Sequence, residues 1–288
     1  MSQLSIITIN YNNLEGLKKT VASIIHQTWK EFEYIVIDGG SIDGSAAYIE
    51  SQSDKIDYWV SEPDNGIYNA MNKGIAKATG EYLLFLNSGD DLTDLKALEE
   101  NYTHLQEKDI IYFNINVVGD NTFFIKRCPE ILIFSFLYRD TLPHQSTFIR
   151  KTLFEDIGYY DEKLKISSDW KFFILALMNL GATYKHVDAV FSNYYLDGIS
   201  SKEDFSIERR EVLESIFGGY ISDYDELFKN RDELVVLRNY QNTNRYRMLV
   251  EIEKSKMGKK MVSIFFRVYL LLFSKKKLND ILNAKLFL

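Results

Sequence analysis

The sequence has very little cysteine: Cys128 is the only one among 288 residues. A single cysteine excludes an intrachain disulfide and a zinc site made of cysteines, so we expect a reducing compartment. The first residues also lack the basic segment, apolar segment and cleavage site of a secretory signal, which predicts a cytoplasmic location. Internal repeats and low-complexity tracts are absent too, as in an ordinary globular chain.

Two glycine-rich motifs are also missing after the first predicted strand. No G-x-G-x-x-G occurs there, which argues against a dinucleotide-dependent oxidoreductase. Residues 5–13 contain no glycine-rich, basic phosphate loop either, and a sugar-phosphate nucleotidyltransferase would need one at that place. Both classes are therefore disfavoured, although the chain is long enough for one large α/β domain with an appendage.

Acidic residues outnumber basic ones, and the excess is unevenly distributed. The 41 Asp and Glu against 34 Lys and Arg give a net charge of −7. Residues 251–288 hold nine basic and three acidic residues, a charge of +6, which leaves −13 for residues 1–250. A body of that charge repels nucleic acid, so we expect no nucleic-acid partner, and only the C-terminal part is suited to an anionic surface.

The sequence does contain three apolar segments that each end on carboxylates or amides: residues 5–12 (SIITINYN), 34–43 (YIVIDGGSID) and 82–92 (YLLFLNSGDDL). Unbroken apolar runs are typical of buried parallel strands, and ligands bind beyond the carboxyl ends of such strands. We therefore expect Asp38, Asp90 and Asp91 to share one crevice. Because clustered carboxylates repel each other, the crevice predicts a divalent cation next to a phosphorylated ligand.

Helical patterns alternate with these strands. Apolar residues recur at helical spacing in residues 14–26, 44–51 and 67–78, which predicts an α/β fold with a mainly parallel sheet. Asn72 and Lys73 lie on the polar side of the third helix. A solvated face and a contact with phosphate or sugar are both open for these two residues.

Four sequence blocks follow one another in a specific order: SIITINYNN at residues 5–13, YIVIDGGSIDGS at 34–45, SEPDNGIYNAMNKGIAKATGEYLLFLNSGDDL at 61–92, and HQSTFIRKTLFEDIGYYDEKLKISSDW at 144–170. Over residues 4–200 the chain thereby resembles the family 2 inverting glycosyltransferases of the GT-A fold. The resemblance implies a mixed, mainly parallel sheet flanked by helices, with a Rossmann-like nucleotide-binding half. It also implies transfer of a sugar from a nucleotide sugar to a hydroxyl group of a glycan, as in bacterial surface polysaccharide synthesis.

The first two strand ends hold the nucleotide in this family. The resemblance gives Tyr11 a stacking role against the base and gives Asp38 a hydrogen bond from a base N–H. A carboxylate only accepts hydrogen bonds, so it selects a base with an imide N–H such as uracil or thymine. A UDP-sugar is therefore the expected donor, and a dTDP-sugar is the second choice.

The Asp-x-Asp motif of the family holds Mn²⁺ or Mg²⁺ against the donor diphosphate. The matching triplet here is Ser88-Gly89-Asp90, so a serine replaces the first aspartate. Asp90 is then the expected metal ligand, Asp91 is a second candidate, and Ser88 would reach the ribose or a metal-bound water. Such a metal is held largely by diphosphate and water, as is normal for Mg²⁺.

The catalytic base of the family is the aspartate of a Glu-Asp pair at a helix start, and this sequence has Ser168-Asp169 there. The resemblance makes Asp169 the base that deprotonates the acceptor hydroxyl, although an aspartate at this position also fits a simple helix cap. His144 and Gln145 fall where the family contacts the donor sugar and diphosphate. Trp170 is placed either at the wall of the acceptor pocket or in the core.

The two altered motifs leave an alternative function open. A lost Asp and a lost Glu are compatible with a catalytically inactive nucleotide-sugar-binding or scaffold protein of the same fold. Binding of UDP without turnover would favour that class. The acceptor is also open between a glycan and a lipid-linked glycan.

The sequence becomes almost wholly helical from residue 207 onward, so we expect a catalytic domain of residues 1–205 and a helical region of residues 206–288. In that region, residues 255–277 have lysines at both ends of a thirteen-residue apolar stretch, which is shorter than the roughly 20 residues that span a bilayer. Three roles are open for such an amphipathic helix: peripheral contact with the inner face of a membrane, docking onto the catalytic domain, and formation of a homodimer.

Overall fold

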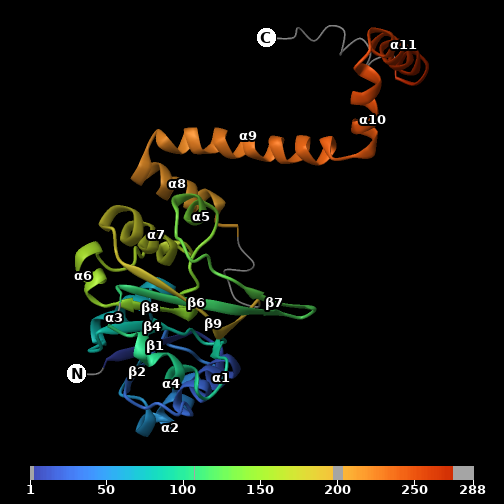
Figure 1. The fold of residues 1–288 in the computed structure, drawn as a ribbon. Coiled ribbons are helices and arrows are strands. Elements are labelled where there is room, and N and C mark those ends of the chain that lie inside the picture. Colours follow the sequence, from blue (N-terminus) through green and yellow to red (C-terminus); the bar gives the residue numbers. More distant parts are fainter. Residues whose placement is uncertain (1–2, 107, 197–203, 275–288) are drawn as a thin grey trace. The chain divides into compact units, whose positions relative to one another are not determined.

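The computed structural model describes residues 3–106, 108–196 and 204–274 (Figure 1). The chain divides into two compact units, Met1–Val212 and Leu213–Leu288, which we describe separately. The expected domain boundary near residue 205 stays a prediction. Of the basic segment 255–277, the last three residues lie outside the described part of the chain.

The first unit is built on one mixed sheet flanked by helices (Figure 1). The order across the sheet is β3 (Tyr58–Ser61), β2 (Phe32–Asp38), β1 (Leu4–Asn10), β4 (Tyr82–Phe85), β8 (Thr147–Arg150), β6 (Ile110–Gly119), β9 (Tyr184–Tyr195) and β5 (Asp91–Leu92), with β7 (Thr122–Lys126) added to β6. Strands β3, β2, β1 and β4 are all parallel, whereas β8 is antiparallel to both of its neighbours. The expected mixed α/β fold is confirmed. Its parallel pairs are those of the N-terminal strands β3, β2, β1 and β4, together with β6 and β9.

Three helices follow β1, β2 and β3: α1 (Leu14–Ile25), α2 (Ser45–Ser51) and α3 (Ile67–Lys77). Asn13 caps α1, because its side chain accepts a hydrogen bond from the Gly16 N–H. Leu17, Val21 and Ile24 recur at helical spacing and are fully buried in the core that covers this part of the sheet. Each such side chain contributes about 1.5–3 kcal/mol relative to an exposed one, so packing holds α1 in place.

Helix α3 lies very close to β1 because Gly74 has no side chain. A Cβ atom at Gly74 would come within 2.5 Å of the Ile7 side chain. The close approach fixes the position of α3, and with it the position of Tyr68, whose side chain is buried.

Short helices complete the first unit after β5. Helix α4 (Ala97–Asn101) is followed by a 3-10 turn (Tyr102–His104), and α5 (Phe134–Arg139) and α6 (Thr152–Ile157) lie on either side of β8 in the chain. Helix α7 (Ser168–Ile174) continues as a π-helix (Leu175–Leu180). Strand β9 lacks a regular alternation of buried residues, and it pairs with β6 over most of its length.

The second unit is helical. Helix α8 (Ser206–Phe217) spans the boundary between the units, and α9 (Tyr220–Gln241), α10 (Asn244–Glu253) and α11 (Lys256–Phe273) follow. The hydroxyls of Thr243 and Ser255 cap α10 and α11, which separates the two helices at fixed residues. Across the described ranges, none of the helices combines the length and apolarity that a membrane span requires.

Candidate active site

Three loops follow the carboxyl ends of β1, β2 and β4, and hydrogen bonds tie them together. The Asn12 N–H donates to Ser41 Oγ at 2.7 Å, and the Asn13 side-chain amide donates to the Ser88 carbonyl at 3.2 Å. Tyr11, on the first of these loops, keeps 66% of its surface exposed. The loops therefore form one surface at the strand ends, and the ring of Tyr11 is free to stack on a flat ligand.

Asp38 ends β2 and is completely buried. Its carboxylate accepts four hydrogen bonds of 2.6–2.9 Å, from the Asn10 amide, the Ser41 N–H, the Ser41 hydroxyl and the Ser61 hydroxyl. Burial raises the pKa of Asp38, but these hydrogen bonds outweigh burial and lower the pKa below its ordinary value. A carboxylate has about four acceptor positions, so all of them are in use. Contrary to expectation, Asp38 does not open onto the crevice, and a base N–H would have to replace one of its present donors.

Asp90 lies in the turn after β4 and is buried. Burial raises the pKa of this carboxyl group from 3.8 to about 6, although His144 and the Gln145 side chain act in the opposite direction. The Asp90 N–H donates to the Asn87 carbonyl at 3.0 Å and closes the turn. In the same turn, Oδ1 of Asn87 is buried and has no hydrogen-bond partner. A buried carboxylate and an unpartnered amide oxygen in one turn are suited to a cation.

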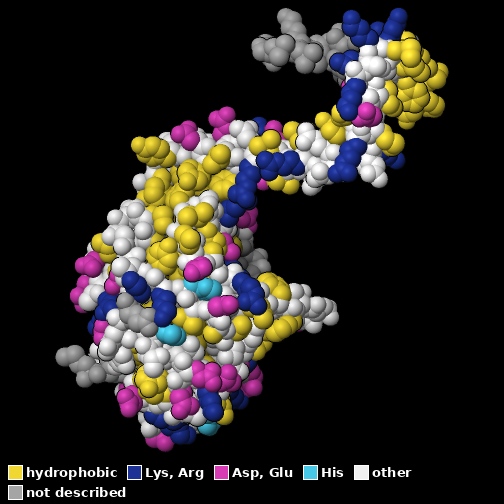
Figure 2. All heavy atoms as spheres, in the orientation of Figure 1, with side chains coloured by type: hydrophobic (Ala, Val, Ile, Leu, Met, Phe, Trp, Pro, Cys, Tyr) yellow, Lys and Arg dark blue, Asp and Glu magenta, His cyan; other side chains and the backbone are white. Residues whose placement is uncertain are grey.

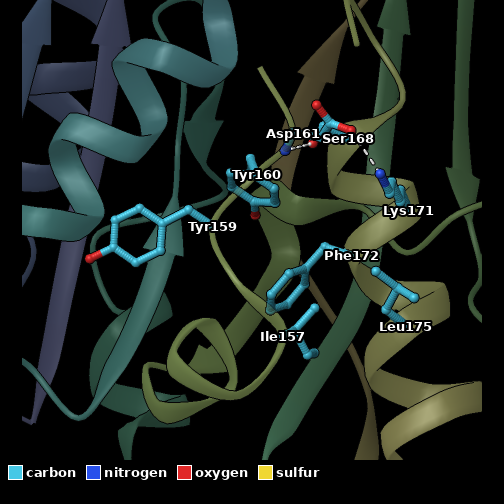
Figure 3. A pocket seen from close by; sticks show the side chains of 8 residues that line it. All are labelled: Ile157, Tyr159, Tyr160, Asp161, Ser168, Lys171, Phe172 and Leu175. Carbon is cyan, nitrogen blue, oxygen red and sulfur yellow. Dashed lines mark hydrogen bonds and ion pairs between the residues drawn. The ribbon is translucent and has the colours of Figure 1, made fainter. Parts of the chain in front are cut away.

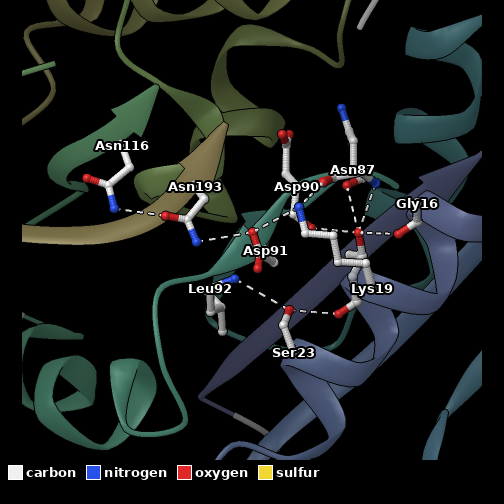
Figure 4. A network of polar contacts seen from close by, with 11 residues as sticks. Gly16, Lys19, Ser23, Asn87, Asp90, Asp91, Leu92, Asn116 and Asn193 are labelled. Carbon is white, nitrogen blue, oxygen red and sulfur yellow. Dashed lines mark hydrogen bonds and ion pairs between the residues drawn. The ribbon is translucent and has the colours of Figure 1, made fainter. Parts of the chain in front are cut away.

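Asp91 is placed differently from its neighbour (Figure 4). Its carboxylate accepts a hydrogen bond from the Asn193 amide at 3.1 Å and lies 3.5 Å from Lys19 Nζ. Lys19 also donates to the Gly89 carbonyl at 3.2 Å and lies over the ring of Tyr195. Asp91 therefore links α1 to β9 through protein contacts, and Asp90 is the better placed of the two for a metal.

Asp169 is at the start of α7 and is buried together with Tyr68 of α3. Its carboxylate accepts a hydrogen bond from the Tyr68 hydroxyl at 2.8 Å and lies 3.2 Å from Nδ1 of His144. Burial raises the pKa of Asp169, but the contacts with His144 and Tyr68 outweigh burial and hold the pKa below its ordinary value. Asp169 is therefore ionised at neutral pH. Its carboxylate also accepts a hydrogen bond from the Trp170 N–H, so three of its roughly four acceptor positions are in use and one is left for a ligand hydroxyl.

His144 connects the two carboxylates. Its Nε2 lies 3.3 Å from the Asn87 side-chain amide, which donates, so the ring proton belongs on Nδ1 facing Asp169. His144 also acts on Asp90 electrostatically. The structure thus brings together Asp90, Asn87, His144, Asp169 and Tyr68 from four separate parts of the chain.

Asn72 and Lys73 are held by other parts of the protein. The Asn72 amide donates to the Tyr160 carbonyl at 2.9 Å and to the Glu162 carboxylate at 2.8 Å, and its oxygen accepts from the Tyr160 N–H. Lys73 Nζ lies 2.7 Å from the Glu62 carboxylate. Both side chains therefore fasten α3 to neighbouring loops, and a contact of either with phosphate or sugar stays a prediction.

The other predicted residues divide between core and site. Trp170 is buried and its indole N–H donates to the Leu137 carbonyl at 2.6 Å, which is the core placement. Gln145 is buried next to His144 and is a hydrogen-bond donor to Asp90. Ser88 is half-buried beside Asp90, and its backbone N–H donates to the Ile9 carbonyl at 3.0 Å.

The residues present fit a metal ion that is held mainly by the diphosphate of a bound nucleotide and by water. Within the described ranges, no group of three or more His, Cys, Asp and Glu side chains is arranged to hold a metal ion. The unpartnered Oδ1 of Asn87 and the buried carboxylate of Asp90 offer two oxygen ligands from one turn. Mg²⁺ commonly uses one or two protein oxygens and takes the rest from phosphates and water. The donor set is therefore sufficient for a diphosphate-bound metal and too small for a protein cage.

A hollow beside α7 is lined by side chains of residues 157–161 and 168–175 (Figure 3). Its polar groups already pair with each other: Lys171 lies 2.7 Å from Asp161, and the Asp161 N–H donates to the Ser168 hydroxyl at 2.5 Å. None of the predicted site residues lines this hollow. It offers no free charged group to a substrate, so the chemistry belongs at the strand ends.

Sequence reasoning missed three residues of the site. Tyr68 and Asn87 meet Asp169 and His144 only through the fold, and Lys19 lies far from Asp91 in the chain. The one local signal was Asn87, which directly follows the apolar strand and precedes Ser88. The other two carry no motif, because a tyrosine or a lysine on a helix is ordinarily a surface residue.

Comparisons with known proteins identify the family and the fold. The sequence profile described as glycosyl transferase family 2 matches residues 5–160. An uncharacterized glycosyltransferase of Mycobacterium tuberculosis is 36% identical over 180 residues, covering 61% of this chain and 69% of the relative. A PGL/p-HBAD biosynthesis glycosyltransferase of Mycobacterium bovis is 28% identical over 201 residues, covering 66% and 75%.

Two solved structures share the fold. Staphylococcus aureus TarS 1–349, crystallised with UDP-GlcNAc, superposes with a TM-score of 0.61 at 20% identity, covering 74% of this chain and 65% of TarS. The mannosyltransferase PcManGT of Pyrobaculum calidifontis, in complex with GDP-Man and Mn²⁺, has a TM-score of 0.53 at 13% identity, covering 86% and 82%. At these identities the likeness concerns the fold.

Proposed function

The chain belongs to glycosyl transferase family 2 and is a glycosyltransferase; from this premise we propose that it moves a sugar from a UDP-sugar to a hydroxyl group of a glycan acceptor with inversion. A bacterial surface polysaccharide is the proposed setting, with a glycan or lipid-linked glycan as acceptor. The observation that carries the proposal is the pair of buried carboxylates joined through His144. Burial raises the pKa of Asp90, whereas contacts with His144 and Tyr68 lower that of Asp169.

Different environments give the two carboxylates different roles. Asp169 stays ionised and accepts hydrogen bonds, so it suits a base that takes the proton of the acceptor hydroxyl. The hydroxyl oxygen then forms a bond to the anomeric carbon of the donor sugar while the bond from that carbon to the diphosphate oxygen breaks on the opposite face. One displacement of this kind inverts the configuration and needs no covalent intermediate.

His144 and Tyr68 position the base. The Nδ1–H of His144 and the hydroxyl of Tyr68 hold the two oxygens of Asp169 from different sides, so the carboxylate cannot rotate freely. Asn87 in turn fixes the histidine ring. A base held in this way meets the acceptor hydroxyl in a fixed geometry, and this orientation lowers the entropic part of the activation barrier.

Asp90 and Asn87 are the residues we propose to hold a divalent cation, Mn²⁺ or Mg²⁺. When bound, that cation stabilises the charge that develops on the leaving diphosphate. The raised pKa of Asp90 supports this role, because a buried carboxylate without a full cationic partner gains most from a cation. Lys19 neutralises Asp91 instead, and a metal contact of Asp91 stays a prediction.

The exposed ring of Tyr11 supports nucleotide binding at the ends of β1 and β2. Stacking on Tyr11 accepts any base, so the choice of UDP rests on the likeness to TarS, which was crystallised with UDP-GlcNAc. The PcManGT structure is a complex with GDP-Man, and GDP is accordingly the second nucleotide to test. Asp38 holds the loop that carries Ser41, and its direct contact with the base stays a prediction.

The decisive experiment compares Asp169→Asn with wild type. Turnover of a UDP-sugar should fall by about 10²–10⁴-fold, because the base is lost, while UDP affinity with Mn²⁺ by calorimetry should stay within about twofold. Asp161→Asn is the matched control. It also removes one negative charge close to α7, where Asp161 pairs with Lys171, and it should keep full turnover.

Two outcomes would contradict this assignment. Parallel loss of UDP binding and turnover in Asp169→Asn would give the residue a structural role. UDP binding by wild type without turnover, across a broad acceptor panel, would favour the alternative of an inactive nucleotide-sugar-binding protein.

A further inference from the structure

Helix α11 separates its polar and apolar residues sharply. Lys256, Lys260, Ser263 and Arg267 follow one line along the helix, spaced four, three and four residues apart. The opposite side carries Met257, Met261, Ile264, Phe265, Val268, Tyr269 and Leu272, which are 49–74% exposed. Figure 2 shows these hydrophobic side chains gathered on α11. We call this side the α11 apolar face.

The described helices of the second unit do not cover the α11 apolar face. Within this unit α10 packs against α11, and the α11 side chains that are half-buried are Val262 and Leu270, neither of which belongs to the α11 apolar face. A contiguous patch of exposed aromatic and aliphatic side chains is typical of an interaction site. The charge pattern of the segment identifies the kind of partner.

The segment around α11 is purely cationic. Residues 254–277 contain eight Lys and Arg and no Asp or Glu. In α11 itself, Lys256, Lys260 and Arg267 are on the polar line, so they accompany the apolar face without interrupting it. An anionic lipid surface matches both features at once, because it offers phosphate groups to the lysines and hydrocarbon to the apolar residues.

We propose that α11 lies in the plane of an anionic membrane, with its apolar face at the boundary between headgroups and acyl chains. A transverse orientation is disfavoured by charge, because the polar line with its basic residues runs along the whole helix, and within the described ranges no helix is long and apolar enough to cross a membrane. Phe265, Phe266, Tyr269 and Phe273 add aromatic rings, which favour the interface. The proposal does not depend on sugar transfer, because binding is measured without donor or acceptor.

Flotation of the full-length protein with vesicles tests the proposal. Wild type should float with phosphatidylglycerol–phosphatidylcholine vesicles and should remain at the bottom with pure phosphatidylcholine. Raising the salt should weaken binding, because charges are screened over about 10 Å at 0.1 M and over about 3 Å at 1 M. Replacing two lysines, Lys256→Gln with Lys260→Gln, should lower the partition coefficient about thirtyfold.

Two double variants with equal charge separate the apolar face from the charge. Phe265→Glu with Leu272→Glu places two carboxylates in the face, whereas Ser263→Glu with Ser274→Glu places two carboxylates on the polar line. The first pair should bind more weakly than the second by on the order of a hundredfold or more, because it also removes two apolar side chains from hydrocarbon. Circular dichroism must show equal helix content in both.

Three results would overturn the proposal. They are equal binding by the two double variants, equal binding of wild type to neutral and anionic vesicles, and no vesicle binding by wild type. In the last case, sedimentation velocity identifies the occupant. A wild-type dimer that Phe265→Glu with Leu272→Glu converts to monomer would assign the face to a second copy of the chain, and a monomer in both cases would assign it to the first unit.

Discussion

Replacing Asp90 by asparagine should make the metal-free protein more stable. Burial raises the pKa of Asp90 from 3.8 to about 6, which means that the folded protein resists ionisation of this group. Each pKa unit corresponds to about 1.36 kcal/mol, so the ionised form costs about 3 kcal/mol of folding free energy above pH 6. Asparagine keeps the size of the side chain and one acceptor oxygen, replaces the other oxygen by an NH2 donor, and carries no charge.

The sign of the pH dependence follows from the direction of the shift. Because the pKa of Asp90 is higher in the folded state, the folded protein binds more protons between pH 3.8 and about 6. The stability of wild type therefore falls as pH rises through that window. The advantage of Asp90→Asn should be about 3 kcal/mol at pH 7.5 and about 1 kcal/mol at pH 4.5.

Urea unfolding in EDTA, followed by tryptophan fluorescence, measures this difference. Trp29, Trp59 and Trp170 all belong to the first unit, so the signal reports the unit that contains Asp90. The midpoint of thermal unfolding should rise by roughly 6–12 °C at pH 7.5 for a unit of this size. Adding Mn²⁺ should stabilise wild type more than the variant, because only wild type has the proposed carboxylate ligand.

Asp91→Asn is the matched control. Asp91 forms a partly exposed ion pair with Lys19, and such pairs contribute about 0–1 kcal/mol, so this variant should be equal to wild type or slightly less stable. If Asp90→Asn is no more stable than wild type at pH 7.5, the reasoning is refuted. It is also refuted if the gain in the free energy of unfolding is the same at pH 4.5 and at pH 7.5, because the charge of Asp90 could then not be its cause.

Two further changes test the strand-end loops. Tyr11→Ala should weaken UDP binding by calorimetry about tenfold without lowering stability, because stacking on a base contributes about 1–3 kcal/mol and the ring is exposed; unchanged affinity would remove Tyr11 from the site. Asp38→Ala should destabilise the first unit by about 3 kcal/mol or more, because it leaves Asn10, Ser41 and Ser61 without their acceptor. Since the pKa of Asp38 is lowered, this loss should be full above the ordinary carboxyl pKa and should shrink as pH falls below it. A loss that is independent of pH would contradict the role of the carboxylate.

The sequence alone determined the fold class and the type of enzyme. Short apolar runs that end on polar residues predict parallel strands, and the four ordered blocks identify the family, which the profile match over residues 5–160 confirms. The sequence also determined the two-sided character of α11, because a helical period and the positions of lysines are local properties. These features depend on residues close together in the chain, which is why pattern reasoning reaches them.

Only the tertiary structure decided which polar groups are free and which are already in use. Asp38 was expected to face the crevice, yet its four acceptor positions are filled by donors from β1, from the end of β3 and from its own loop. Tyr68 reaches Asp169 across 101 positions of sequence, and His144 reaches it across 25. The number of donors around a carboxylate, and its burial, depend on chain segments that no local pattern connects, and those two quantities set the charge and the chemistry of the site.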